Sequence, residues 1–126
     1  MTRFVVLAIL TFSIAVTVTA SQPAPDSERR AAITVLRAIN TAENAVRSQS
    51  GKYIPLADLL GHAMMGGVKG NFAVDGNSFR YAGAQVRLAL SADATQYVVT
   101  VVSGGPNYTA AFTDERGIIY TGKALE

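Results

Sequence analysis

Histidine is the first residue type to consider, because one imidazole can serve acid–base catalysis or bind a metal ion. The chain has a single histidine, His62, and no cysteine. A Ser-His-Asp arrangement would have to use His62, yet this residue lies in a glycine-rich stretch without a nucleophile elbow nearby. A zinc site needs at least three nitrogen, sulfur or carboxylate ligands. We therefore expect His62 to be an exposed loop residue that is neither catalytic nor metal-binding.

Acidic residues in the C-terminal half are candidates for calcium binding. Asp75, Asp93 and the adjacent pair Asp114 and Glu115 are spaced apart, and each lies in a turn context. Asp readily hydrogen-bonds to its own local backbone in turns, and no run offers the alternating oxygen ligands of a calcium loop. The alternative of a single calcium ion bound by residues from several loops stays open. The stretch GGVKGN, Gly66–Asn71, lacks the Ser or Thr after the lysine that a phosphate-binding loop needs.

Glu43 is a candidate acid, because it borders the apolar stripe of a predicted helix. A partly buried carboxylate can have a raised pKa and act in catalysis. The alternative is that Glu43 bonds to backbone groups or pairs with an arginine at the edge of the sheet. We favour this alternative, because no second carboxylate or histidine lies nearby in sequence. The sequence therefore assigns no catalytic, cofactor-binding or metal-binding residue, and it predicts a protein that is not an enzyme and has no cofactor.

The elements that position these residues begin with an amphipathic helix, predicted from about Ser27 to Ser50. Its apolar residues recur at three- and four-residue spacing, which places them on one face: Ala32, Val35, Leu36, Ile39, Ala42 and Val46. Gly51 supplies the left-handed residue at which helices commonly end. Pro55 can begin a second, short helix, because a first turn does not need the missing N–H. The glycine-rich stretch Gly61–Asn71 is expected to be a loop.

The periodicity then changes from helical to alternating. Alternating or β-branched segments lie around Phe79–Tyr81, Val86–Leu90, Gln96–Val102, Asn107–Thr113 and Gly117–Gly122. We interpret them as three or four short antiparallel strands joined by hairpins, with no parallel crossover helices. The predicted fold is therefore α+β, a long N-terminal amphipathic helix packed on a small antiparallel sheet of three or four strands.

The N-terminal segment has the layout of a secretory signal peptide. One positive charge, Arg3, precedes an uncharged apolar run, and small residues form a plausible cleavage site before Ser21. We expect residues 1–20 to be removed, residues 21–26 to be a linker, and residues 27–126 to form one domain. The alternative is that residues 4–20 remain as an inner-membrane anchor, although this run is marginal for a span of roughly 20 residues. We therefore expect an exported protein, periplasmic or extracellular, with no stable membrane span after cleavage.

The charge balance argues against nucleic-acid binding. Without residues 1–20, ten Lys and Arg stand against nine Asp and Glu, which is a net charge of +1. A nucleic-acid footprint would need clustered Lys and Arg. The absence of cysteine also removes disulfides, so a domain of this size must rely on packing alone.

Two segments resemble the head domains of bacterial type IV pilin-like proteins and type II secretion pseudopilins. AITVLRAINTAENAVRSQSGKYIPLADLL, Ala32–Leu60, is similar to the start of such heads, in which an INTAE-like helix end runs into G-x-Y-x-x-L-x-x-L. The matching positions are Ile39, Asn40, Thr41, Ala42 and Glu43, and then Gly51, Tyr53, Leu56 and Leu59. FTDERGIIY, Phe112–Tyr120, resembles the closing hairpin, with its F-x-D-x-x-G-x-I pattern. The similarity covers most of residues 30–122.

The chain departs from these families at its N-terminus. Pilins carry a cleavage site just before a Phe and a glutamate five residues into an apolar filament helix; here no Gly precedes Phe4, and residue 8 is Ala8. The segment SQPAP also separates the apolar run from the predicted helix. The resemblance therefore implies a free head domain that acts by protein–protein contact, accessory to a pilus or a type II secretion system. The alternative is a small exported ligand-binding module on the same fold. The first hypothesis predicts an exposed apolar patch, and the second predicts a concave apolar pocket with convergent polar groups.

Overall fold

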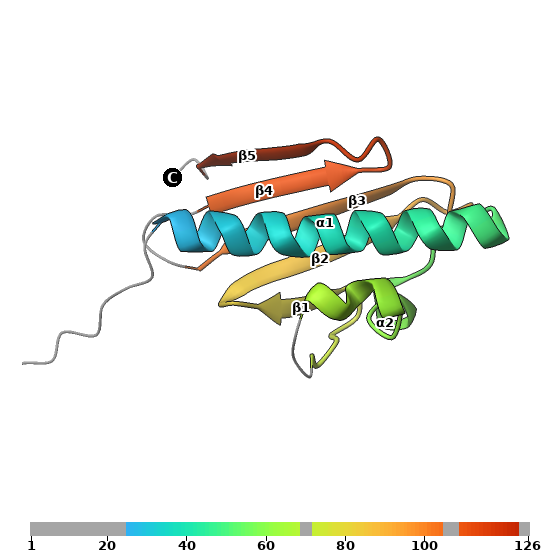
Figure 1. Ribbon diagram of the computed structural model, residues 1–126, viewed down its shortest axis with the longest axis horizontal. Coiled ribbons are helices and arrows are strands. Elements are labelled where there is room, and N and C mark those ends of the chain that lie inside the picture. The colour runs from blue at the N-terminus through green and yellow to red at the C-terminus, as the bar shows by residue number, and fades with distance from the viewer. Residues whose placement is uncertain (1–24, 69–71, 105–108, 124–126) are drawn as a thin grey trace, which may run out of the picture.

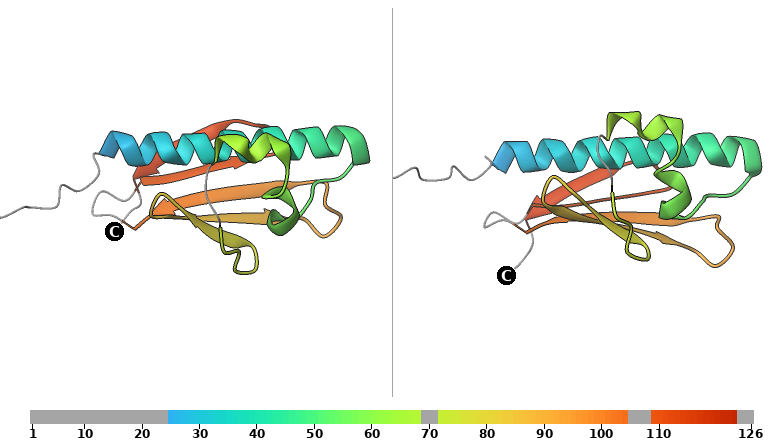
Figure 2. Two further views of the ribbon diagram at one scale, coloured as in Figure 1. Left: turned by 60° about the horizontal axis from the view of Figure 1, so that its bottom comes forward. Right: turned by 90° about the horizontal axis from the view of Figure 1, so that it is seen from below.

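The computed structural model describes residues 25–68, 72–104 and 109–123. Three helical elements come first: α1 (Pro25–Ser50), the short helix α2 (Leu56–Leu59) and the 3₁₀-helix η1 (Ala63–Gly67). Five strands follow: β1 (Ser78–Tyr81), β2 (Ala84–Leu90), β3 (Tyr97–Ser103), β4 (Thr109–Asp114) and β5 (Ile119–Lys123). Figure 1 shows α1 lying lengthwise across one face of the sheet, and the views of Figure 2 separate the helix layer from the sheet layer. The α+β prediction is confirmed.

Helix α1 begins two residues earlier than predicted, so Pro25 and Asp26 belong to it and not to the linker. A proline is favourable at the first helical position, because its fixed φ is already helical. The helix ends as predicted, with Gly51 at a φ of +77° and its N–H donating to the carbonyl of Arg47 at 2.7 Å. The predicted signal peptide and residues 21–24 of the predicted linker lie outside the described residues.

The sheet is an antiparallel meander in the order β1-β2-β3-β4-β5. Five strands are one more than the highest number predicted from the sequence. Ala82 and Gly83 form a two-residue hairpin between Tyr81 and Ala84, so the alternating segments around Phe79–Tyr81 and Val86–Leu90 are two separate strands. Both central residues have positive φ, +49° and +79°, as a type I′ turn requires. Alanine seldom adopts this conformation, so the sequence did not signal a turn there.

The core lies between α1 and the inner face of the sheet. Alternate strand residues point toward the helix and are buried: Phe79, Val86, Leu88, Tyr97, Val99, Val101, Ala111 and Thr113. They pack against the apolar stripe of α1, in which Val35, Leu36 and Ile39 are fully buried. Burial of this apolar area is the main contribution to the stability of the fold.

The stretch after α1 closes one side of the core. Helix α2 follows Pro55, where the sequence predicted a second short helix, and its Leu56 and Leu59 are buried. The prediction of a loop over Gly61–Asn71 was wrong for Ala63–Gly67, which forms η1. Met65 and Val68 are buried here, because these two side chains fill the core beside α1. Burial of two apolar side chains outweighs the low helical preference of a glycine-rich sequence.

Within the described residues, none of the helices is both long enough and apolar enough to cross a membrane. The apolar run of residues 4–20, on which the anchor hypothesis depends, lies outside that part of the chain.

Candidate functional site

The outer face of the sheet, which faces away from α1, carries a group of exposed apolar side chains. We call Val98, Val102, Phe112 and Tyr120 the outer-face patch; they are 45%, 44%, 45% and 40% exposed. Strand alternation places them together, because β3 alternates strictly between buried and exposed residues and β4 follows the same pattern around Phe112. Single exposed apolar residues are common on protein surfaces, whereas a group of them on one face indicates an interaction surface.

Aromatic stacking forms the centre of the outer-face patch. Phe112 and Tyr120 lie directly opposite each other on β4 and β5. Their ring centroids are 4.7 Å apart, and the ring planes differ by 16°. Each ring therefore covers one side of the other, while the outward sides stay open to solvent. Tyr is strongly enriched at protein interfaces because it offers apolar area together with a hydroxyl.

Charged residues lie at the rim of the outer-face patch. Asp114 is opposite Val98 in the β3–β4 pair, and it forms an ion pair of 2.6 Å with Arg116. Hydrogen bonds from Arg116 hold the pKa of Asp114 below its ordinary value. On the other side, the exposed Arg87 of β2 is opposite Thr100. An apolar centre with a polar rim is the usual composition of a protein-binding surface.

The sequence contained a signal for this surface that our prediction did not use. In the segment YVVTVVS of β3, apolar β-branched residues occupy the outward positions as well as the inward ones. A strand with one solvent-facing side normally alternates between apolar and polar residues. The outward pair Val98 and Val102 therefore departs from this pattern and marks the outer face.

Beneath the sheet, a chain of hydrogen bonds joins β3, α1 and β4. The hydroxyl of Tyr97 donates to Oδ1 of Asn40 at 2.6 Å. Nδ2 of Asn40 donates to Oγ1 of Thr113 at 3.0 Å, and this hydroxyl in turn donates to the carbonyl of Ile118 at 2.9 Å. Every donor in the chain has an acceptor, so these buried polar groups fix the position of α1 on the sheet.

Glu43 is fully buried on α1, next to this chain. Its Oε2 accepts a hydrogen bond from the N–H of Ile54 at 3.0 Å, whereas Oε1 has no hydrogen-bond partner among the described residues. Loss of solvent raises the pKa of Glu43 to about 7, and the bond from Ile54 only partly opposes this rise. The backbone bond that the sequence suggested is present, but the arginine is not paired with this carboxyl. Arg47 instead donates to the hydroxyl of Tyr53 at 2.8 Å.

The burial of Glu43 decides what its carboxyl can do. General acid–base catalysis requires the group to lie within hydrogen-bond reach of a substrate. A carboxyl with 0% exposure is closed to any substrate in this conformation. Its geometry therefore supports a structural contribution at the junction of α1 and the segment after Gly51.

His62 lies in the loop between α2 and η1, as expected, but it is half-buried and not exposed. It precedes η1, and its Nδ1 accepts a hydrogen bond from the N–H of Met64 at 3.2 Å. The first N–H groups of a helix lack intrahelical acceptors, and Nδ1 of His62 supplies an acceptor for one of them. His62 is therefore the N-cap residue of η1.

The four acidic residues considered for calcium lie at three places in the chain: Asp75, Asp93, and the adjacent Asp114 and Glu115 at the end of β4. Asp93 accepts hydrogen bonds from the hydroxyls of Ser91 and Thr95, which lower its pKa to about 2. Asp75 lies in a turn and forms an isolated bridge with Ser78. In the part of the chain that the structure describes, no three His, Asp or Glu residues lie close enough to hold a metal ion. Gly66–Val68 belong to η1 and its end, and residues 69–71 of the considered phosphate loop lie outside the description.

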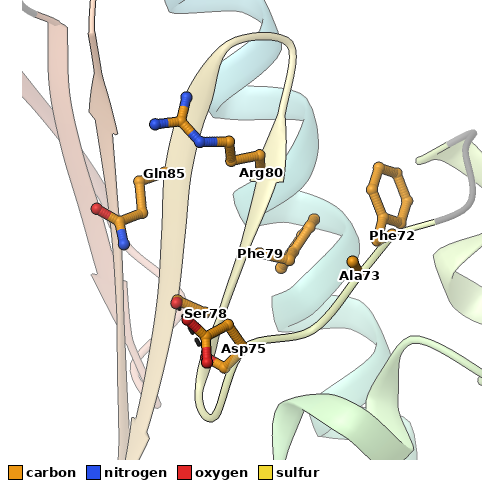
Figure 3. Close-up of a pocket in the computed structure, with 7 residues that line it drawn as sticks. All are labelled: Phe72, Ala73, Asp75, Ser78, Phe79, Arg80 and Gln85. Carbon is orange, nitrogen blue, oxygen red and sulfur yellow. Dashed lines mark hydrogen bonds between the residues drawn. The ribbon is translucent and has the colours of Figure 1, made fainter.

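A hollow of about 380 Å³ lies along the edge strand β1. It is lined by Phe72, Ala73, Asp75, Ser78, Phe79, Arg80 and Gln85. Figure 3 shows the rings of Phe72 and Phe79 on one side of β1, and Arg80 and Gln85 on the other. Since Arg80 and Gln85 are cross-strand partners on the outer face, their polar groups do not converge with the rings on one point.

Comparison with known proteins leaves the fold as the established property of this chain. The N-terminal helix and the antiparallel sheet that follows it agree with the layout expected from the sequence. No protein-family model, no curated protein and no solved structure matches the chain.

Proposed function

We propose that this protein is an exported, non-enzymatic head domain of the pilin-like kind, which binds another protein through the outer-face patch. The observation that carries the proposal is the patch itself, with Phe112 and Tyr120 stacked at its centre and charges at its rim. The partner in this proposal belongs to a pilus or to a type II secretion system. Export rests on the signal-peptide layout of residues 1–20.

The order of the elements supports the pilin-like part of the proposal. The segment that resembles pilin heads runs from α1 through Gly51 to α2, and the segment that resembles their closing hairpin forms β4 and β5. In this arrangement α1 covers one face of the sheet and leaves the other face open. A partner can therefore approach the outer-face patch without displacing the helix.

Side-chain chemistry supports binding over catalysis. Glu43 is closed to solvent, and His62 caps a turn. Phe and Tyr, by contrast, contribute much of the binding energy at protein interfaces when a partner covers them. The alternative function, binding of a small ligand, would use the hollow beside β1. That hollow is less suited to a ligand, because its rings and its polar groups lie on opposite sides of the strand.

The test has two parts, the first of which concerns export. Intact mass and N-terminal sequencing of the protein recovered from the exported fraction should give a start at Ser21. An N-methylated Phe4, or retention in the membrane with an intact N-terminus, would contradict the exported free-head proposal.

The second part compares two variants with the same new side chain on opposite faces of the molecule. Phe112→Lys places a charge in the outer-face patch, and Thr34→Lys places one on the exposed face of α1. Proteins captured from the exported fraction by the wild type should be lost with Phe112→Lys and kept with Thr34→Lys. Equal capture by both variants, or loss with Thr34→Lys alone, would show that the outer-face patch is not the contact.

A further inference from the structure

The two edges of the sheet differ in how they are covered. Strand β1 is short, and the segment before it lies against it, with Phe72 packed on Phe79 and Tyr81 at centroid distances of 5.0 Å and 6.0 Å. Strand β5 is the other edge and pairs only with β4 among the described strands. Figure 1 shows β5 at the margin of the sheet. An open edge presents unpaired N–H and C=O groups to any strand that can pair with it.

Two rows of outward side chains run across the sheet and end on β5. One row consists of Thr100, Phe112 and Tyr120, and the next consists of Val102, Ala110 and Gly122. The first row ends at the edge with the two stacked rings of Phe112 and Tyr120, whereas the second row ends with Gly122, which has no side chain. The edge therefore has a projecting half and a recessed half, two residues apart.

From this shape we infer that β5 pairs antiparallel with β5 of a second copy, about a twofold axis at Thr121. Thr121 is the middle residue of Ile119–Lys123, so this is the register in which all five residues of each strand find a partner. Tyr120 then lies opposite Gly122 of the second copy. The row that ends at Gly122 in one copy therefore continues into the row that ends at Tyr120 in the other. The two sheets become one sheet of ten strands with an isologous interface.

Gly122 gives independent support, because nothing among the described residues requires a glycine there. A Cβ built at this position meets no atom within 4 Å, and the residue does not have the positive φ that favours glycine. Glycine weakens a strand, since it has no side chain to pack. An aromatic ring from a neighbouring strand compensates for this weakness by lying over the glycine. In the pairing that we infer, Tyr120 of the second copy supplies that ring.

Charge and the position of α1 are compatible with a second copy as the partner. Lys123 is the one charged residue of β5, and its opposite residue in this register is Ile119, so no like charges meet. Helix α1 packs mainly on β3 and β4, which keeps the helices of the two copies apart. A contact through one short strand is small, so we expect a weak dimer, with a Kd on the order of 100 µM. The inference goes beyond the proposed function, because the outer-face patch can bind a partner whether or not the copies pair.

Thr121 allows a decisive test, because it is exposed and it meets itself at the axis. Thr121→Glu and Thr121→Lys each place two like charges opposite each other in the dimer, at a position that is exposed in the single chain. The mass of the purified protein, measured by sedimentation over concentrations up to about 1 mM, should rise toward a dimer for the wild type. Each variant alone should associate at least about tenfold more weakly than the wild type. An equimolar mixture of the two variants should recover the dimer.

Two controls separate this interface from others. Thr100→Glu and Thr100→Lys place the same charges on β3, in the middle of the outer face, and should leave dimerisation unchanged. Loss of the dimer in these variants would indicate face-to-face packing and overturn the inference. Gly122→Val should melt at the same or a higher temperature than the wild type, because the added side chain has space, yet it should not dimerise.

Three results would refute the inference directly: a wild type that stays monomeric up to about 1 mM, a charged Thr121 variant that dimerises as strongly as the wild type, or a mixture of the two variants that associates no more strongly than each variant alone. None of these results bears on capture through Phe112, so failure of the dimer and failure of the proposed function are distinguishable.

Discussion

The buried carboxyl of Glu43 should make the fold less stable as pH rises from acidic to basic. Burial raises the pKa of Glu43 from 4.5 to about 7, because the charged form loses its hydration and Oε1 gains no hydrogen bond from the described residues in return. Below pH 4.5 the carboxyl is protonated in both the folded and the unfolded chain, and its full contribution to stability is present. As pH rises through about 7 the folded chain must also ionise it, and that contribution is lost.

The size of the effect follows from the two pKa values. One pH unit of difference corresponds to about 1.36 kcal/mol. Between 4.5 in the unfolded chain and about 7 in the folded chain, the free energy of unfolding should fall by about 3 kcal/mol. A small domain has a total stability of roughly 5–15 kcal/mol, so this loss is a large fraction of it.

Glu43→Gln isolates the effect, because the amide keeps an acceptor for the N–H of Ile54 but does not ionise. Urea unfolding of both proteins at constant ionic strength, from about pH 4 to about pH 9, gives the difference in free energy of unfolding at each pH. The variant should gain about 3 kcal/mol on the wild type across this range, whatever its stability at the acidic end.

Asp93→Asn is the matched control. Hydrogen bonds lower the pKa of this exposed carboxyl to about 2, so its contribution is present above 3.8 and is lost only in stronger acid. Its unfolding curves should therefore run parallel to the wild type above about pH 5. Parallel curves for Glu43→Gln would refute the argument. A wild type that gains stability over the variant with rising pH would show that the ionised carboxyl is stabilised by the fold.

Further substitutions test the helix–sheet junction and the end of α1. Asn40→Ala should cost about 2 kcal/mol in urea unfolding, since the buried hydroxyl of Tyr97 loses its acceptor; the exposed neighbour Thr41→Ala should change stability by less than about 0.5 kcal/mol. An equal loss for both would mean that the buried bond contributes nothing. Gly51→Ala should cost about 1 kcal/mol, because the backbone holds a φ of +77° in open space. Gly66→Ala also meets open space but has no positive φ, so it should be neutral or slightly stabilising, and a loss at Gly66 comparable to that at Gly51 would refute the strain argument.

Local patterns were sufficient to predict α1, α2 and an antiparallel sheet, although not η1 or the number of strands. The apolar stripe of α1 and Gly51 define one helix and its end, because both depend on neighbouring residues. The same is true of Leu56 and Leu59 in α2. Where the prediction failed, tertiary packing overrides local preference: η1 forms in a glycine-rich stretch because Met65 and Val68 fill the core.

The contacts that give the molecule its candidate functions depend on register and were not predictable in this way. Tyr97 and Asn40 are 57 residues apart in sequence, and nothing in either segment specifies the other as its partner. Phe112 and Tyr120 were both placed in the closing hairpin, but their stacking depends on the register of β4 and β5. The sequence could identify Glu43 as a carboxyl at the border of the apolar stripe; only the packed structure shows that its Oε1 has no hydrogen-bond partner among the described residues.

The two faces of the sheet separate stability from association, which makes the experiments independent of one another. Glu43 lies on α1, which covers the inner face, whereas Phe112 belongs to the outer face. Thr121 lies at the free edge and is exposed in the single chain. Substitutions at separated sites without shared partners are close to additive. Glu43→Gln should therefore change the pH dependence of unfolding and leave the dimer intact, and the charged Thr121 variants should do the reverse. If a Thr121 variant altered the pH dependence, edge pairing and the buried carboxyl would be coupled through the core, and the separation of the two faces would be wrong.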